Sequence, residues 1–363
     1  MIEQINIENY KSIRQGKITL TNLNVLIGAN GAGKSNFISL FELLQAVLNQ
    51  RLGSHVLSHG GIDNLLYRGQ KQSKFIRMLI DFDNTNAFFC ELRPTTSNKA
   101  FIELSGDYFN NRKDTTKNYE KKWNKMIWDQ SVEESKILFN SQWRASYLRK
   151  FLKSFTVYHF HDTSLSSPMR KPCPINDNDK LRHDASNLAA YLYRLQQTTP
   201  QTFNMIENVI RSIAPYFKRF VLRPNPAMRN FITLEWEEND SDMYLDATNL
   251  SDGTLRFIAL TTLLLQPELP ETVIIDEPEL GLHPTAINKL AALVRNAAKQ
   301  KQIILATQSV NIVSCFSPED IIVADRKDEQ SVFTRLNSDQ LSMWLEDYSL
   351  GDIWEKNLIG GQP

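Results

Sequence analysis

The N-terminal part of the chain alternates apolar and polar positions as half-buried strands do. Ile2–Ile7 predicts a first strand and Ile18–Leu20 a second. Two later runs, 75–82 and 87–92, flank the turn signal Asp83-Asn84-Thr85-Asn86 and predict an antiparallel pair that 101–104 extends. Together these patterns predict an antiparallel β subdomain.

Short, continuously apolar runs mark a second kind of strand. Leu23–Ile27, Val273–Ile275 and Ile303–Ala306 predict buried strands, and helical spacing follows the first two at 36–48 and 285–299. Because a strand–helix–strand order produces parallel strands, we expect an α/β fold whose mixed or parallel central sheet is flanked by helices. The same patterns predict further helices at 62–66, 187–196, 203–214 and 255–265, and further strands at 157–160, 220–223 and 231–236.

Composition changes after Gly106, where Lys, Arg, Asn and aromatic residues replace the strand pattern. We expect a short helical insertion over 106–155, with helices at 119–128 and 133–155. Basic residues interleave with aromatics in it: Arg112, Lys113, Lys117, Tyr119, Lys121, Lys122, Trp123, Lys125 and Trp128. Such a set suits contact with a nucleic-acid backbone and bases. The alternative is a solvated helical face whose aromatics pack inward, which is the more usual role of a charge run.

Overall charge leaves the nucleic-acid question open, because Lys+Arg and Asp+Glu both number 41 in the 363 residues. Cys90, Cys173 and Cys315 are far apart and have no metal-ligand spacing, which is typical of a reduced cytosolic chain. The N-terminus does not resemble a signal peptide, and the longest apolar stretch, 257–265, is too short to span a bilayer. We therefore expect a cytoplasmic protein without a membrane partner.

A phosphate-binding loop lies between the strand 23–27 and the helix 36–48. Gly28–Ser35 matches G-x-x-x-x-G-K-[ST], whose glycines turn backbone N–H groups toward a phosphate at a helix N-terminus. Lys34 is predicted to reach the β- and γ-phosphates of ATP, and Ser35 to ligate Mg²⁺. The predicted nucleotide-binding residues of this loop are Asn30, Gly31, Ala32, Gly33, Lys34, Ser35 and Asn36.

Two later strands end in polar residues that suit ATP chemistry. Asp276 is predicted to hold Mg²⁺, and Glu277 to orient and polarise the attacking water. Paired acids at a buried strand end are costly without a cation, which favours a metal partner over a plain acidic turn. After the next strand, Gln308 within Thr307-Gln308-Ser309 can reach the γ-phosphate or the attacking water.

A second anion-binding turn opens the helix 255–265. Ser251, Asp252 and Gly253 combine a hydroxyl, a glycine N–H and the helix dipole, although a plain N-cap would look the same. One chain with two phosphate sites favours two chains around shared ATP. Each ATP would be held by the loop of one copy and by the Ser-Asp-Gly turn of the other.

These motifs resemble those of the SMC/RecF-like branch of ABC ATPases. The resemblance rests on Ile7–Ile13, Gly28–Ser35, Leu250–Thr254, Asp276–Pro284 and Thr307–Ser309. The tail, Trp344–Gly351 with Trp354–Asn357, is similar to that of stand-alone bacterial AAA-type ATPases of the OLD/RecF branch, often linked to anti-phage defence. The resemblance implies an ABC-type P-loop NTPase fold, an ATP-sandwich homodimer that could assemble further, and an approach of Lys11 to the phosphates.

Three departures from the ABC pattern affect the expected chemistry. The signature is Ser-Asp-Gly, Gln308 stands where transporter ATPases have a histidine, and no clear Q-loop glutamine is present. His161 and Asp162 occupy the equivalent strand end, with Gln70 a weaker candidate. We expect an N-terminal ATPase lobe over 1–105, the insertion over 106–155, a C-terminal ATPase lobe over 156–336 and a tail over 337–363.

The leading functional hypothesis is an ATPase that dimerises on ATP and acts as a switch or sensor. Because the chain lacks the acidic cluster of a Toprim nuclease, the expected output is a separate effector such as a nuclease, in anti-phage defence. The alternative is a DNA-repair or maintenance ATPase that binds DNA directly. Gln308 argues against a transporter subunit, and intact Lys34, Asp276 and Glu277 argue against a degenerate scaffold.

Other candidate residues have more ordinary explanations. His159, His161, His183 and His283 lack a zinc-ligand spacing, and His283-Pro284 is expected to open a helix. The C-terminal aromatics Trp344, Tyr348 and Trp354 are expected to pack on the main body, the alternative being a docking surface for a partner protein.

Overall fold

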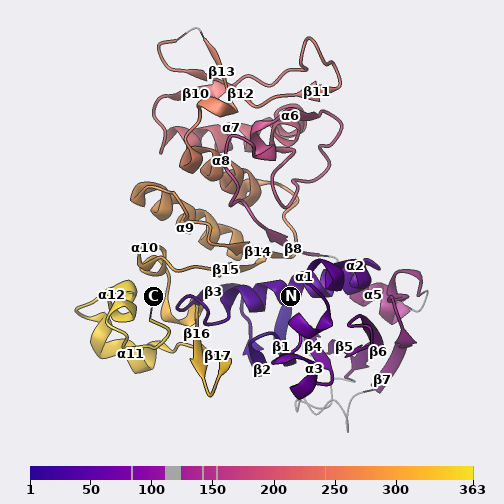
Figure 1. Ribbon diagram of the computed structural model, residues 1–363. Helices are drawn as coiled ribbons and strands as arrows, with labels where there is room; N and C mark the ends of the chain where they lie inside the picture. The colour runs from indigo at the N-terminus through magenta and orange to yellow at the C-terminus, as the bar shows by residue number, and fades with distance from the viewer. Residues whose placement is uncertain (83–84, 111–123, 141–142, 153, 242, 363) are drawn as a thin grey trace. The chain divides into compact units, whose positions relative to one another are not determined.

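The computed structural model describes residues 1–82, 85–110, 124–140, 143–152, 154–241 and 243–362 (Figure 1). It divides the chain into two compact units: unit 1 comprises 1–156 with 304–363, and unit 2 comprises 157–303. Residues 304–336 therefore belong with the N-terminal residues, whereas the sequence grouped them with 156–303.

An antiparallel six-stranded sheet forms one half of unit 1. Its strand order is β2-β1-β4-β5-β6-β7, and every neighbouring pair is antiparallel. The predicted antiparallel subdomain is confirmed. The strands are β1 (Ile2–Tyr10), β2 (Ile13–Thr19), β4 (Ile76–Phe82), β5 (Asn86–Pro94), β6 (Ala100–Phe109) and β7 (Asn124–Val132).

The remaining strands of unit 1 surround β3 (Leu23–Ile27), which is buried along its whole length. On one side β3 runs parallel to β16 (Ile321–Lys327), which in turn pairs antiparallel with β17 (Gln330–Arg335). On the other side lies β15 (Gln302–Ala306), so the order is β17-β16-β3-β15. The uninterrupted apolar runs at 23–27 and 303–306 are explained by this central placement.

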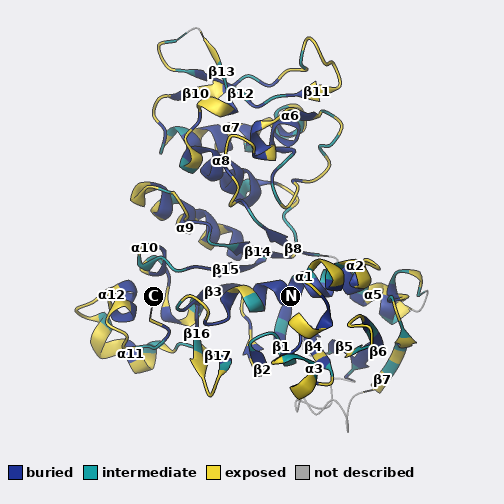
Figure 2. Ribbon diagram, in the orientation of Figure 1, coloured by how far each residue is buried: buried dark blue, intermediate teal, exposed yellow. Residues whose placement is uncertain are grey.

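Helix α1 (Lys34–Leu48) packs on both β structures of unit 1. Phe37 contacts the ring of Phe333 on β17, with 5.6 Å between centroids, and Ser39 Oγ lies 3.0 Å from the Tyr10 hydroxyl of β1. Figure 2 shows α1 largely buried. The other described helices of unit 1 are α2 (Leu52–Ser58), η1 (Ile62–Asn64), α3 (Gly69–Gln72), η2 (Ile137–Phe139), α5 (Trp143–Leu152), α10 (Val310–Val313), η5 (Pro318–Asp320), α11 (Ser338–Leu345) and α12 (Leu350–Glu355).

Unit 2 is built around helix α8 (Asp252–Leu265) and strand β14 (Thr272–Asp276), both mostly buried. The neighbours of β14 are β15 and β8 (Phe155–Tyr158). The strand–helix–strand order β14, α9, β15 is the one that the apolar pattern predicts. Other elements are α6 (Leu188–Thr198), α7 (Pro200–Arg211), α9 (Pro284–Ala298), η3 (Pro168–Arg170), η4 (Ala247–Asn249), β9 (Cys173–Pro174), β10 (Phe217–Phe220), β11 (Phe231–Ile232), β12 (Glu235–Glu238) and β13 (Tyr244–Asp246).

The helical insertion is the main error of the secondary-structure prediction. Residues 124–128 were expected in a helix but belong to β7, which pairs with β6; residues 119–123 lie outside the described residues. The edge of β6 offers unpaired backbone groups, and pairing with them outweighs local helical propensity. The second expected helix, 133–155, shrinks to α5 with the short η2 before it.

The basic and aromatic residues of this region have a structural explanation where they are described. Lys125 Nζ lies 4.8 Å from the ring centre of Phe89 and 5.6 Å from that of Tyr108. Trp128 donates from Nε1 to Asp107 Oδ2 at 2.9 Å. Trp128 therefore supports the alternative in which the aromatics pack inward, whereas Lys125 is exposed, as a residue on a solvated face would be. The others of the set, Arg112, Lys113, Lys117, Tyr119, Lys121, Lys122 and Trp123, lie outside the described residues.

The C-terminal aromatics do not act as one stripe. Trp354 is 0% exposed and donates from Nε1 to the Gly361 carbonyl at 2.6 Å, so it packs on the main body as expected. Trp344 and Tyr348 remain exposed. No helix in the described parts of the chain has the length and apolar character needed to cross a membrane.

Candidate nucleotide-binding site

The phosphate-binding loop has the backbone that its glycines permit. Gly31 and Gly33 have φ angles of +78° and +116°, in the left-handed region that other residues avoid. A Cβ on Gly33 would lie 2.2 Å from Ser331 Oγ of β17, so a side chain could not fit there. The loop is therefore packed against β17 at Gly33, which is buried, whereas Asn30 and Gly31 at its tip are exposed.

Lys34 folds back over this loop. Its side chain is 5% exposed, and Nζ donates to the carbonyls of Gly28 and Ala29, the latter at 3.1 Å. An ammonium group held by neutral carbonyls can exchange them for stronger charge-assisted bonds to phosphate oxygens. Ser35 lies exposed in the first turn of α1, where an incoming cation can reach its hydroxyl.

The turn between β1 and β2 lies beside the first turns of α1. Asn36 donates from Nδ2 to Ser12 Oγ at 2.7 Å, and Ser12 shares a 2.6 Å hydrogen bond with Ser331. Lys11 donates from Nζ to Ser39 Oγ at 2.8 Å, and burial lowers the pKa of Lys11, against the opposing effect of Glu42. The structure thus places Lys11 against α1, and its approach to the phosphates stays a prediction.

Gln308 follows the strand adjacent to the one that enters the loop. The neighbouring Thr307 is buried and donates its backbone N–H to the Leu26 carbonyl at 2.9 Å. The carboxyl ends of β3 and β15 therefore lie side by side, which is where open α/β sheets bind ligands. Unit 1 thus gathers the loop, Lys11 and Gln308.

The predicted acids of unit 2 lie at the end of β14. His161 donates from Nε2 to the backbone carbonyl of Asp276 at 2.8 Å, which ties the end of β14 to the segment after β8. Glu277 has a φ of +42°, an uncommon conformation for a non-glycine residue that often marks functional sites. Further along, His283 caps α9 and accepts from the Thr285 N–H, so it opens a helix as expected.

The Ser-Asp-Gly turn begins α8. Ser251 is the N-cap, and its Oγ accepts a hydrogen bond from the Thr254 N–H at 3.2 Å. A Cβ on Gly253 would lie 2.4 Å from the Gly281 carbonyl oxygen, so the turn packs tightly on the loop that follows β14. Unit 2 thus gathers Ser251, Asp252 and Gly253 together with the segment that follows Asp276 and Glu277.

Two buried arginines beside this turn were missed at the sequence level. Arg170 binds the segment around Ser251, with its Nη2 2.7 Å from Asp252 Oδ1. Arg256 donates from Nε to the Phe160 carbonyl and from Nη2 to the His161 carbonyl, both at 2.8 Å. Neither arginine belongs to a recognisable spacing, so only their contacts identify them.

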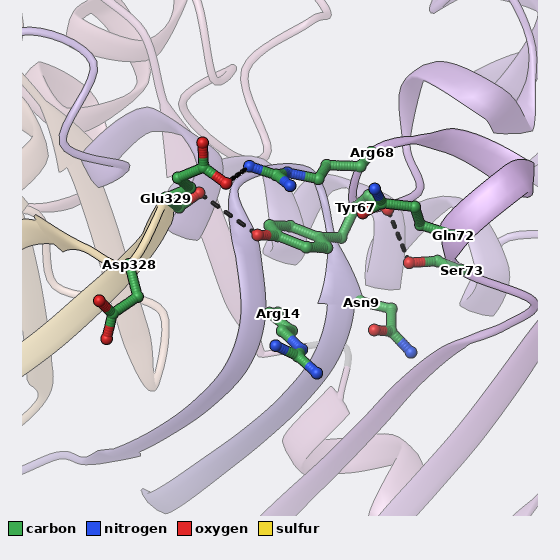
Figure 3. A pocket seen from close by; sticks show the side chains of 8 residues that line it. All are labelled: Asn9, Arg14, Tyr67, Arg68, Gln72, Ser73, Asp328 and Glu329. Carbon is green, nitrogen blue, oxygen red and sulfur yellow. Dashed lines mark hydrogen bonds and ion pairs between the residues drawn. The ribbon is translucent and has the colours of Figure 1, made fainter.

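A polar pocket of about 320 Å³ lies elsewhere in unit 1 (Figure 3). An ion pair between Arg68 and Glu329 crosses it, and the Tyr67 hydroxyl donates to the Glu329 carbonyl at 3.4 Å. None of the predicted site residues lines it. Its lining residues are Asn9, Arg14, Tyr67, Arg68, Gln72, Ser73, Asp328 and Glu329.

A family model described as "AAA domain, putative AbiEii toxin, Type IV TA system" matches residues 23–314. The chain belongs to this AAA family. The match begins at β3 and ends after α10, so it contains the phosphate-binding loop, the Ser-Asp-Gly turn, the acids of β14 and Gln308.

Other relatives of this AAA-family chain agree with that assignment. The phosphate import ATP-binding protein PstB of Mycoplasmoides gallisepticum is 20% identical over 158 residues, which are 42% of the chain and 48% of PstB. The chain thus spans about half the length of the curated relative it matches. This likeness to an ATP-binding protein and the family match agree with the predicted ATPase resemblance.

Two solved Smc heads show the same fold. One, bound to the C-winged helix domain of ScpA, has a TM-score of 0.62 and 15% identity, covering 94% of this chain and 99% of that one. The other, from Pyrococcus furiosus and bound to the C-terminal domain of ScpA, has a TM-score of 0.56 and 14% identity, covering 95% and 98%. The predicted ABC-type P-loop NTPase fold is confirmed.

Proposed function

We propose that this chain binds ATP with Mg²⁺, dimerises on it and hydrolyses it. One observation carries the proposal: each compact unit contains one turn at a helix N-terminus that suits an anion, the glycine loop with Lys34 in unit 1 and the Ser251 turn in unit 2. Two such turns fit one shared site per nucleotide when two copies pair head to tail. The sandwich dimer is the assembly that uses both turns.

The loop supplies most of the nucleotide contacts in this proposal. Backbone N–H groups from Asn30 to Asn36 surround the phosphates, and Lys34 exchanges the Gly28 and Ala29 carbonyls for phosphate oxygens. Among the described residues, no group of three or more His, Cys, Asp or Glu side chains is arranged to hold a metal ion. Ser35 and Asp276 would hold Mg²⁺ together with phosphate oxygens and water, which is how this ion usually binds at nucleotide sites.

Hydrolysis is assigned to the residues that follow β14 and β15. Glu277 orients the attacking water and accepts its proton, and its positive φ marks a backbone held in an uncommon conformation at this point. Gln308 contacts the γ-phosphate or the same water. When bound, Mg²⁺ neutralises charge on the phosphates. Ser251 of the second copy completes the site from the other side.

The biological output of the dimer is proposed as a switch. The family description names a putative AbiEii toxin of a type IV toxin–antitoxin system, which is the support for a role beyond ATP hydrolysis alone. ATP-driven closure would control a separate effector, such as a nuclease, in bacterial anti-phage defence. Direct DNA binding in repair stays the alternative prediction.

The test is Glu277→Gln, with Glu271→Gln at the opposite end of β14 as the matched control, because Glu271 is exposed and pairs with Lys301. We expect Glu277→Gln to bind ATP normally, to release phosphate at least about 100-fold more slowly and to accumulate as an ATP-bound dimer. Phosphate release and light scattering after gel filtration measure both effects. Hydrolysis at the wild-type rate in the Glu277 variant would contradict the assignment.

A further inference from the structure

Arg170 uses its whole guanidinium group to hold the segment that contains Ser251. Its side chain is 3% exposed, and Nε donates to the Thr163 carbonyl at 2.8 Å. Nη1 donates to the carbonyls of Ala247 and of Leu250, the latter at 3.0 Å, and Nη2 donates to Asp252 Oδ1 at 2.7 Å. A fixed, planar group with five donors suits such a convergent arrangement.

These contacts lie on both sides of Ser251. Leu250 precedes the serine and Asp252 follows it, and both accept hydrogen bonds from the same side chain. The hydroxyl of Ser251 is further oriented by Thr254, whose Oγ1 is 2.8 Å away. The direction in which the turn presents Ser251 therefore depends on Arg170, which comes from a segment 80 residues earlier in the chain.

Arg170 also balances a charge that an anion site would otherwise oppose. The Asp252 side chain is 66% exposed and lies next to the serine, in the first turn of α8. A carboxylate at this position interacts favourably with the helix dipole, but it repels an incoming triphosphate. The guanidinium of Arg170 makes the pair neutral and leaves the N–H groups of the helix N-terminus to attract the phosphate.

We propose that Arg170 is the positioning residue of the Ser-Asp-Gly turn. It fixes the backbone around Ser251 and neutralises Asp252, so that the turn can accept the γ-phosphate of ATP bound to a second copy. The inference rests on the shared-ATP dimer proposed above. It concerns a residue that acts through Ser251 and does not itself touch the nucleotide.

The experiment compares Arg170→Gln, Asp252→Asn and the double variant, with Arg182→Gln as the matched control. Arg182 also pairs with an aspartate, Asp177, in the same unit at 2.6 Å, but its side chain is 57% exposed, so it controls for loss of an arginine charge outside the buried network. The equilibrium affinity for ATP measures binding to the phosphate-binding loop of a single copy. Sedimentation in the presence of ATP measures dimerisation. These two readouts separate a defect in the turn from general damage, because misfolding lowers both.

We expect Arg170→Gln to keep ATP affinity within about twofold and to weaken ATP-driven dimerisation about tenfold or more, since a charged hydrogen-bonding group is lost. Adding Asp252→Asn should restore part of the dimerisation, because the uncompensated carboxylate is removed while an acceptor oxygen is kept. Arg182→Gln should behave as wild type. Wild-type dimerisation by Arg170→Gln, or no recovery in the double variant, would overturn the proposal.

Two further variants keep the test decisive. If Arg170→Gln does not fold, Arg170→Lys is the substitute, because it keeps the positive charge but lacks the planar guanidinium group. It should weaken dimerisation less than Ser251→Ala does. Dimerisation of Arg170→Lys equal to that of the wild type would reject the positioning role.

Ser251→Ala separates this proposal from the one on which it rests. Normal ATP-driven dimers of Ser251→Ala would reject the shared-ATP site itself, whereas weak dimers of Ser251→Ala beside normal dimers of Arg170→Gln would reject Arg170 alone.

Discussion

His55, on α2, shows how the residues around α1 alter protonation. Its ring lies 4.3 Å from the ring of His59, centre to centre. Burial, His59 and Lys11 together lower the pKa of His55 to about 4, and Glu42 on α1 opposes them. The folded protein therefore keeps His55 neutral at pH values where an unfolded chain binds a proton.

This difference predicts a pH effect on stability. The unfolded chain binds the proton near pH 6.5, so the stability contributed by neutral His55 is present above that pH and is lost as the pH falls toward 4. Acidification should therefore lower the free energy of unfolding of the wild-type protein more than that of His55→Gln. We expect the difference to be about 1 kcal/mol, after allowance for solvent screening of a half-exposed ring. Urea unfolding at pH 7.5 and 4.5 measures it.

The control for this measurement is His183→Gln, because His183 is an exposed histidine of unit 2. It should show the same pH dependence as the wild-type protein. An unchanged acid-induced loss in His55→Gln would contradict the assigned environment of His55.

The residues proposed to bind or hydrolyse ATP could be predicted from the sequence, whereas the residues that hold them in place could not. Lys34, Ser35, Asp276 and Glu277 stand in spacings that nucleotide binding imposes, so local sequence identifies them. The bond between Ser12 and Ser331 joins positions 319 residues apart, and no local pattern encodes it. Arg170 was not predicted for the same reason, since its partners in the Ser-Asp-Gly segment lie about 80 residues away in the chain.

At the scale of elements, those with their own hydrophobic period were predicted best. The strand 23–27 coincides with β3, and the helix 36–48 lies within α1. The prediction for β7 was wrong because pairing with the edge of β6 determines its conformation, and that edge exists only in the tertiary structure. The same physical cause limits any prediction of short edge strands from local sequence.

Helix α2 is held by a side chain from outside the helix. Glu134, which follows β7, accepts hydrogen bonds from the N–H groups of Leu52 and Gly53 at 3.0 and 2.9 Å. We expect Glu134→Ala to destabilise unit 1 by about 1 kcal/mol, as the loss of an N-cap does. Faster hydrogen exchange at the first amides of α2, with a lower urea midpoint, measures the effect.

Glu133 supplies the matched control, because it is the exposed neighbour in the chain. Glu133→Ala should leave both the exchange rates and the midpoint unchanged. Equal protection of the α2 amides in the wild type and in Glu134→Ala would show that the cap contributes nothing.

At the scale of the whole molecule, fold class followed from the order of strands and motifs. The parallel pairing of β3 with β16 and the six-stranded antiparallel sheet belong to a fold that a solved Smc head shares, with a TM-score of 0.62. The grouping of 304–363 with the N-terminal residues was not predictable from composition, since no change of composition marks position 304. Long-range strand pairing determines it.

The shared site can be tested by mixing two inactive variants. Lys34→Ala damages the loop of one copy, and Ser251→Ala damages the turn of the other. If two copies share each ATP, mixed dimers contain one intact site, and equal amounts of freely exchanging chains should recover about a quarter of the wild-type rate. A mixture of Lys34→Ala with Glu277→Gln should stay inactive. In the proposed dimer, Lys34 and Glu277 of one copy serve the same ATP, so each site of a mixed dimer lacks one of the two residues.

Phosphate release by the mixture of Lys34→Ala and Ser251→Ala is therefore the most direct measurement of the central claim. The account predicts two inactive proteins that regain activity when combined. Persistent inactivity of the mixture, once exchange of chains has been demonstrated, would contradict it, as would full activity of Ser251→Ala alone.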